Sequence, residues 1–219
     1  MRFKTQNTFC LALIVVVAIQ LIGCSDKPVN LSIARESVKE YYESGKFDEE
    51  LDNVIRDAKD KFSKIEFTES SVVIFDVDET ALNNYEISKK MGYGYVYEMV
   101  YEWTQDAKVP AFPQVKELYD YLLSKGSKII FLTARGYDEY DATYKNLINQ
   151  GYNGFDTLLT KSKNEYEMKS LEFKSSKRVE LIEMGYEIIG TVGDQWSDLE
   201  GPHHGIQVKI PNYLYQKAF

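Results

Sequence analysis

From residue 71 onward, short apolar runs alternate with stretches of helical periodicity, and this alternation constrains the fold more than any other feature. The runs are "SVVIFDV", "KIIFLTAR", "DTLLT", "EIIGTVGD" and "GIQVKIP". Helical patterns over 113–125, 137–150 and 170–184 separate the first four runs. Short β-branched runs joined by helices are typical of a parallel sheet with helices on both faces. We therefore expect an α/β fold of the Rossmann-like type.

A separate helical pattern precedes the sheet. Apolar residues recur at helical spacing over 31–66, and Ser44-Gly45-Lys46 divides the pattern into two helices. The stretch 84–112, after the first run, is rich in tyrosine, and helices are expected near 85–91 and 95–106. The sequence therefore predicts an N-terminal helical extension and an insertion after the first strand.

The N-terminal stretch "MRFKTQNTFCLALIVVVAIQLIGC" has a basic start and an apolar core shorter than the roughly 20 residues of a bilayer span. It predicts a secretory signal over 1–23. Leu21-Ile22-Gly23-Cys24 resembles the bacterial lipobox, which implies cleavage before Cys24, lipidation of that residue and a tether over 24–30. An ordinary signal peptide with an incidental cysteine is the alternative. We expect a lipid-anchored protein of the bacterial cell envelope, sorted to the outer membrane in a Gram-negative cell.

Composition excludes several classes of protein. Hydrophobic residues make up 44% of the 219 residues, enough for a sizeable core, so a disordered chain is not expected. The formal net charge of −8 argues against a nucleic-acid polymer as partner. Cys10 and Cys24 are the two cysteines, so the domain expected over 31–219 contains neither a disulfide nor a free thiol.

Polar side chains follow three of the predicted strands at the point where each strand ends. The carboxyl ends of parallel strands meet at one edge of the sheet, where ligands bind. Clustered carboxylates repel one another unless a cation lies among them, and Mg²⁺ prefers such oxygen ligands. The chain has two histidines and no thiol in the expected domain, which disfavours zinc. The residues concerned are Asp76, Asp78, Thr133, Arg135, Asp194 and Asp198, with Lys174 or Lys177 on the preceding helix.

Four motifs, in this order, resemble those of haloacid-dehalogenase (HAD) superfamily phosphatases: D-x-D-E-T, T-x-R, a downstream lysine and G-D-x-x-x-D. The strings "FLTAR", "FKSSKR" and "VGDQWSDLEG" are similar to the class B/C acid phosphatase branch, which includes bacterial lipoprotein acid phosphatases and plant vegetative storage proteins. The resemblance runs from Val72 to the C-terminus. It implies an exported, Mg²⁺-dependent acid phosphatase that hydrolyses phosphomonoesters, 5′-nucleotides among them, through an aspartyl-phosphate.

The resemblance also implies roles for individual residues. Asp76 is the expected nucleophile and a metal ligand. Asp78 is the expected general acid/base, and its backbone carbonyl is a further ligand. Thr133 is expected to hydrogen-bond the phosphoryl group. Lys174 is expected to neutralise the phosphoryl charge, with Lys177 as the alternative.

Asp194 is the third expected Mg²⁺ ligand by the same resemblance. Asp198 is expected to orient a metal-bound water or the lysine, and an ordinary acidic residue at a helix N-terminus is its alternative role. His203 and His204 follow the last motif and are interpreted as loop residues.

In this superfamily a cap is inserted after the first strand, which corresponds here to about 84–112. Its aromatic residues either stack on a flat leaving group or pack within the cap, and we favour packing. Two other functions remain open: phosphoryl transfer to an alcohol, and a non-catalytic storage or binding lipoprotein. A dehalogenase is disfavoured because those enzymes need neither Mg²⁺ nor the second aspartate. The aromatic residues are Tyr93, Tyr95, Tyr97, Tyr101 and Trp103.

Overall fold

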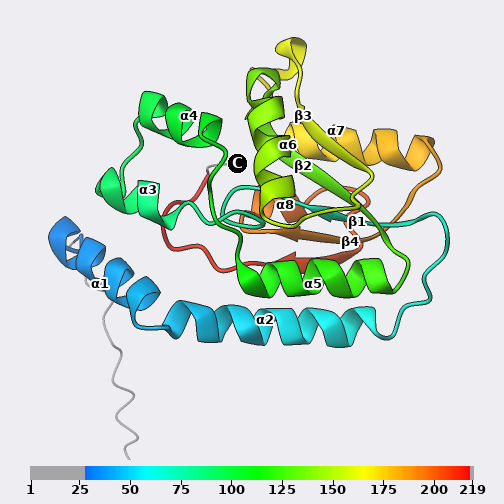
Figure 1. Cartoon of the computed structure of the whole chain (residues 1–219), viewed down its shortest axis with the longest axis horizontal. Coiled ribbons are helices and arrows are strands. Elements are labelled where there is room, and N and C mark those ends of the chain that lie inside the picture. The colour runs from blue at the N-terminus through cyan, green and yellow to red at the C-terminus, as the bar shows by residue number, and fades with distance from the viewer. Residues whose placement is uncertain (1–27, 218–219) are drawn as a thin grey trace, which may run out of the picture.

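A five-stranded parallel sheet forms the centre of the computed structural model, which describes residues 28–217 (Figure 1). The strand order is β3-β2-β1-β4-β5, and every neighbouring pair is parallel. The predicted α/β fold with a parallel sheet is therefore confirmed. The strands are β1 (Ser71–Phe75), β2 (Lys128–Gly136), β3 (Thr157–Lys161), β4 (Glu187–Gly193) and β5 (Ile206–Lys209).

Helices cover both faces of the sheet, as Figure 1 shows. The alternating side chains of β1 go to the two faces: Val73 and Phe75 join one core cluster, and Val72 and Ile74 join the other. The first cluster lies beneath α2 (Lys46–Phe62) and α5 (Pro113–Ser124), and the second beneath α7 (Ser170–Glu183). Because both faces are buried, the strands are apolar throughout, which explains why their sequences contain continuous apolar runs.

The N-terminal helices pack into this core. α1 (Leu31–Glu43) and α2 are separated at Gly45, whose φ of 85° falls in the left-handed region that favours glycine. The Phe62 side chain is fully buried beside β4. A Cβ atom added at Gly190 would lie 2.5 Å from Cζ of Phe62. The glycine therefore leaves room for the aromatic ring, and the helical extension is part of the sheet's packing.

The insertion after β1 contains α3 (Tyr85–Lys90) and α4 (Tyr97–Gln105), close to the predicted ranges. The side chain of Trp103 donates a hydrogen bond from Nε1 to Oδ1 of Asn84 at 3.0 Å. Tyr97 and Tyr101 stack on each other, with ring centroids 5.8 Å apart. These contacts support the interpretation of packing within the insertion for Tyr97, Tyr101 and Trp103, whereas the Tyr95 side chain is exposed.

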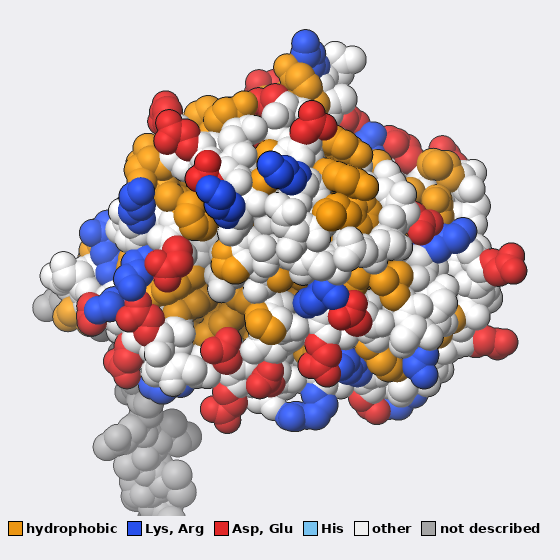
Figure 2. Space-filling model, in the orientation of Figure 1, with side chains coloured by type: hydrophobic (Ala, Val, Ile, Leu, Met, Phe, Trp, Pro, Cys, Tyr) orange, Lys and Arg blue, Asp and Glu red, His pale blue; other side chains and the backbone are white. Residues whose placement is uncertain are grey.

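Four further helical segments complete the described chain. α6 (Tyr140–Asn149) follows a turn of 3₁₀ helix over 137–139, and a second such turn covers 163–165. α8 (Trp196–Leu199), which the sequence pattern did not predict, directly follows β4. Among the described helices, none is long and apolar enough to cross a membrane. On the face drawn in Figure 2, acidic and basic side chains are interspersed, and no broad basic patch is visible.

We predict that Phe62→Ala lowers the free energy of unfolding by about 3–5 kcal/mol, because it leaves a cavity between α2 and β4. Urea unfolding followed by circular dichroism measures the change. Met184→Ala is the matched control, since its side chain is 71% exposed and should cost little. Equal stabilities for the two variants would show that α2 does not contribute to the core.

Candidate active site

The Lys174 ammonium lies between two buried carboxylates at the carboxyl edge of the sheet. Its Nζ donates to Oδ1 of Asp76, directly after β1, and to Oδ1 of Asp198 in α8 at 2.7 Å. All three side chains are at least nine-tenths buried. Burial alone would lower the pKa of Lys174, but Asp198 and Asp76 raise it above its ordinary value. The lysine is therefore a permanently charged group inside the cluster.

Asp76 is held less firmly in its charged form. Burial raises the pKa of Asp76 to about 6, against the opposing effect of Lys174 and with a further upward contribution from Asp198. One carboxylate oxygen, Oδ1, accepts from the lysine. The other, Oδ2, accepts no hydrogen bond from the residues that the structure describes, which leaves it available to a ligand or an electrophile.

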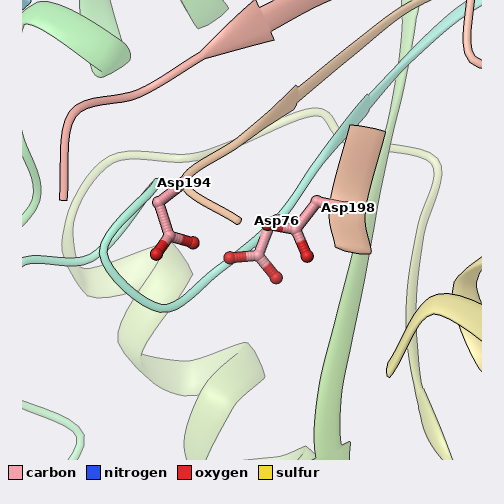
Figure 3. A group of neighbouring side chains, drawn as sticks. All are labelled: Asp76, Asp194 and Asp198. Atoms are coloured by element: carbon pink, nitrogen blue, oxygen red, sulfur yellow. The ribbon is translucent and has the colours of Figure 1, made fainter. Parts of the chain in front are cut away.

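Asp194 directly follows β4 and lies beside Asp76. Figure 3 shows the carboxylates of Asp76, Asp194 and Asp198 gathered together from β1, β4 and α8, and one oxygen of each lies within 4.8 Å of the others. Gln195 and Asn212 both donate side-chain hydrogen bonds to Oδ2 of Asp194, each at 2.6 Å. Burial, together with the charges of Asp198 and Asp76, raises the pKa of Asp194 well above its ordinary value.

Asp198 has a different environment, because both of its oxygens are already engaged. Oδ1 accepts from Lys174, and Oδ2 accepts from the backbone N–H of Gln195 at 2.9 Å. The second bond belongs to a capping box that begins the short helix α8. Asp198 is thus placed to orient Lys174, and both suggested roles, lysine partner and helix cap, are present in one residue.

The side chain of Asp78 points to a second cation, Arg135 at the end of β2. Nη2 of Arg135 donates to Oδ1 at 2.6 Å and Nε to Oδ2 at 3.0 Å, which makes a bidentate pair. Nη1 donates to the hydroxyl of Thr143 in α6, and Asn84 also donates to Oδ1 of Asp78. Burial alone would raise the pKa of Asp78, but Arg135 outweighs it and the net pKa is lowered.

The other predicted residues divide into those near the cluster and those away from it. Thr133 is buried near the end of β2, where its Oγ1 accepts from the backbone N–H of Arg135 at 3.2 Å. Lys177 lies elsewhere and pairs with Glu165 and Glu180. Lys174 is therefore the lysine that the fold brings to Asp76. His203 and His204 lie in the loop between α8 and β5 and make no contact with the carboxylate cluster among the described hydrogen bonds.

A segment after β5 closes one side of the site. Tyr215 donates from its hydroxyl to Oε2 of Glu79, and the backbone N–H of Lys217 donates to Oε1 of Gln195 at 2.9 Å. Glu79 has a positive φ of 53°, and burial raises its pKa to about 7. In Figure 1 this segment, coloured red, runs beneath α3 and rises toward α4. The metal ligand candidate Asp194 is joined to it through Asn212.

A cavity of about 400 Å³ opens between this segment, the insertion and β2. Asp78 and Arg135 form part of its floor, and apolar and aromatic side chains from the insertion form a wall. The cavity thus begins beside the predicted general acid/base and extends under the cap. The wall residues include Ile87, Met91, Tyr95 and Val100.

The charges of the cluster fit a divalent cation. Asp76, Asp194 and Asp198 face one ammonium, that of Lys174, which leaves an excess of two negative charges when all three are ionised. The Asp78 charge is balanced separately by Arg135. The donor atoms are all oxygens, as Mg²⁺ prefers. The raised pKa values of Asp76 and Asp194 have the same origin, since each carboxylate is buried beside others.

A family model described as "HAD superfamily, subfamily IIIB (Acid phosphatase)" matches residues 18–218. The chain belongs to this family. Its reaction class is therefore that of a phosphomonoesterase, and the family resemblance of the sequence motifs is confirmed. HAD phosphatases generally use a divalent metal, which agrees with the acidic triad described above.

Known relatives include both enzymes and storage proteins. A "Stem 31 kDa glycoprotein" of soybean is 35% identical over 82% of this chain and 73% of the relative. "Acid phosphatase 1" of tomato is 32% identical over 81% of this chain and 72% of its own length. "Vegetative storage protein 1" of Arabidopsis is 32% identical over 66% of this chain and 55% of its own. The solved class C acid phosphatase of Bacillus anthracis has the same fold, with a TM-score of 0.67, 22% identity and 85% of each chain covered.

The predicted location in a bacterial cell envelope is wrong by this comparison. These curated relatives come from soybean, tomato and Arabidopsis, which points to a plant protein. The prediction rested on residues 1–24 alone. Short apolar targeting segments are similar in different organisms, so such a segment does not identify the organism. Those residues, Cys24 included, lie outside the described part of the chain, so cleavage and lipidation there stay predictions from sequence.

Several residues of the site were not assigned a role from sequence. Arg135 was noticed within its motif, but its bond to Asp78 depends on how β1 and β2 are paired. Asn212, Tyr215 and Lys217 follow β5 in a stretch without regular structure, and no sequence motif marks them. The glutamine of the string G-D-Q is the residue that links the motif to this segment. Its side chain contacts both Asp194 and the backbone of Lys217.

We predict that Arg135→Lys lowers kcat for p-nitrophenyl phosphate by about 10- to 100-fold, with the fold retained. Lysine keeps the charge but cannot make the bidentate bond that orients the Asp78 carboxylate. Steady-state kinetics measure the loss, and a thermal melt verifies folding. Arg56→Lys on the exposed side of α2 is the matched control. A wild-type kcat for Arg135→Lys would refute the orienting role.

Proposed function

We propose that this chain is a Mg²⁺-dependent phosphatase in which Asp76 carries the phosphoryl group during turnover. The observation that supports this most directly is the placement of Asp76 beside Lys174, with Oδ2 of the carboxylate left unengaged by the described residues. A buried carboxylate next to a permanent cation can approach a phosphate dianion that it would otherwise repel. Its raised pKa of about 6 also indicates a group under strong local influence, as functional carboxylates often are.

In the first step, a carboxylate oxygen of Asp76 attacks phosphorus and the bond to the leaving-group oxygen breaks. Lys174 offsets negative charge on the phosphoryl oxygens, and the Thr133 hydroxyl donates to one of them. Asp198 keeps the lysine in position, since it holds the ammonium from the opposite side. The product is an acyl phosphate on Asp76 and an alkoxide that requires a proton.

Asp78 supplies that proton and later removes one from the attacking water. Arg135 holds Asp78 as a carboxylate in the free protein, with a lowered pKa, so this state is suited to the second step, in which a base is needed. For the first step Asp78 must be protonated, and we infer that substrate entry weakens its bond to Arg135. Water then attacks phosphorus, Asp76 leaves, and inorganic phosphate is released.

The proposed Mg²⁺ ligands are the side chains of Asp76 and Asp194 and the backbone carbonyl of Asp78. When bound, the ion would supply a Lewis acid that offsets charge on the phosphoryl group. Asn212 and Gln195 would orient Asp194 by their bonds to its Oδ2. Oδ1 accepts one long bond, from the Thr80 hydroxyl at 3.4 Å, and is the oxygen that would hold the metal. Asp198 is not proposed as a ligand because both of its oxygens are engaged.

The cavity under the cap favours a bulky, partly flat leaving group, and we propose that 5′-nucleotides are among the substrates. Its volume of about 400 Å³ exceeds what a phosphate alone requires. Tyr95 and Met91 line it, which gives aromatic and apolar surface for a nucleobase. Other aromatic residues of the insertion are committed to one another or to Asn84.

We predict that wild-type protein hydrolyses p-nitrophenyl phosphate and 5′-nucleotides with Mg²⁺, and that EDTA abolishes this reversibly. Asp76→Asn should lower kcat by about 10³-fold or more, because it removes both the nucleophile and a ligand. Phosphate release measures both effects. Asp57→Asn, on the exposed side of α2, is the matched control. Activity that survives in Asp76→Asn would exclude the covalent mechanism while leaving the hydrolytic function in place.

The same assay distinguishes hydrolysis from two other functions. The vegetative storage proteins among the relatives favour a second candidate, a storage or binding protein with this fold. Absence of hydrolysis by wild type with Mg²⁺ would support it, although the intact Asp76, Asp78, Lys174 and Asp194 argue for turnover. Phosphoryl transfer to an alcohol would appear as new phosphomonoester when glycerol is added to the reaction.

We also propose that residues 1–23 act as an export signal that is removed from the mature protein, because a basic start and an apolar core lie ahead of the four phosphatase motifs. The prediction is that the secreted protein begins at or near residue 24. Intact-mass and N-terminal peptide analysis of protein expressed from the full chain tests this. Recovery of an N-terminus at Met1 from a secretion-competent host would refute it.

A further inference from the structure

Among the described residues, two cationic side chains line the cavity under the cap, and they differ in their hydrogen bonds and ion pairs. Arg135 donates through Nε and Nη2 to Asp78 and through Nη1 to Thr143. Lys217 also lines the cavity, and its side chain is exposed to solvent. Its ammonium is within salt-bridge distance of none of the carboxylates in the described residues. Lys217 is thus a positive charge that a ligand in the cavity can pair with.

The backbone holds Lys217 at this position, although its side chain pairs with no carboxylate of residues 28–217. Its N–H donates to Oε1 of Gln195 at 2.9 Å, and Gln195 is bound in turn to Asp194. Two residues earlier, Tyr215 donates from its hydroxyl to Glu79. Because both anchors lie in the loops that follow β1 and β4, the position of Lys217 is fixed relative to the catalytic carboxylates.

The other charged side chains of the cavity are mostly carboxylates, which would repel an anionic ligand unless a cation offsets them. Asp78, Glu79 and Glu139 line it, and Arg135 balances the first of these.

Lys217 is also on the leaving-group side of the site. The phosphoryl group is expected at Asp76, where Lys174 already supplies a cation. Neither Asp76 nor Lys174 lines the cavity, whereas Asp78, the proposed proton donor to the leaving group, does. A charge on the leaving group would therefore approach Lys217, while the phosphate remains with Lys174.

We propose that Lys217 is a specificity-determining residue that selects phosphomonoesters whose leaving group carries a second anionic group, a carboxylate or another phosphate. This rests on the proposed phosphatase function and narrows its substrate class. Among nucleotides, it favours those with a further phosphate on the nucleoside. The ion pair forms at a partly exposed site, so its contribution is moderate and decreases with ionic strength.

The test compares two substrates of similar size, 3-phosphoglycerate and glycerol 3-phosphate, which differ in a carboxylate against a hydroxymethyl group. The quantity measured is the ratio of their kcat/KM values, from phosphate release with Mg²⁺. Lys217→Gln should lower the ratio about tenfold, Lys217→Glu should lower it further, and Lys217→Arg should keep most of it. Raising the salt concentration should lower the wild-type ratio and leave the ratio of Lys217→Gln nearly constant.

Lys64→Gln is the matched control, because Lys64 is exposed at the end of α2 and pairs with Asp60. It should keep the wild-type ratio. A ratio that is unchanged in Lys217→Gln, or an equal loss for both substrates, would overturn the inference while the phosphatase function stands. Absence of turnover of every phosphomonoester by wild type would overturn both.

Discussion

The ammonium of Lys174 is the group on which the arrangement of the site depends. It lies between Asp76 and Asp198 in a buried environment where neither carboxylate could remain charged without a nearby cation. Each member comes from a different element: the loop after β1, α7 and α8. The sheet order places β1 beside β4, and α7 crosses one face between β3 and β4, so the topology brings the three together. Burying three charged groups gives little net stability, which fits the catalytic role proposed for this triad.

The two aspartates of the D-x-D motif have different electrostatic environments although they are two residues apart in the chain. Asp76 turns toward Lys174 and has a raised pKa, whereas Asp78 turns toward Arg135 and has a lowered one. Distinct environments allow two carboxylates to perform distinct chemistry, one on phosphorus and one on protons. The cation for Asp78 comes from β2, on the opposite side of β1 from β4. The cation for Asp76 comes instead from α7, so two different elements determine the environments of the two aspartates.

Sequence patterns predicted the sheet and the cluster because strand ends in parallel sheets converge whatever the details of packing. Asp76, Asp194 and Lys174 were found in this way, the lysine from the string around Phe173. α8 was missed because four residues are too few to show a helical period. Arg135, Asn212 and Lys217 act through contacts between distant segments, which no local pattern encodes. The wrong location arose from a terminal motif whose meaning depends on the organism rather than on the fold.

The segment after β5 has a consequence for the order in which the protein becomes competent during synthesis. The five described strands all precede residues 212–217 along the chain, so the ribosome synthesises them before it adds Asn212, Tyr215 and Lys217. Until then Asp194 lacks one of its two side-chain donors of hydrogen bonds at 2.6 Å, and Glu79 lacks its tyrosine partner. A nascent chain can therefore form its core while its site is still incomplete. The segment thus contributes to the site although it adds no strand to the described sheet.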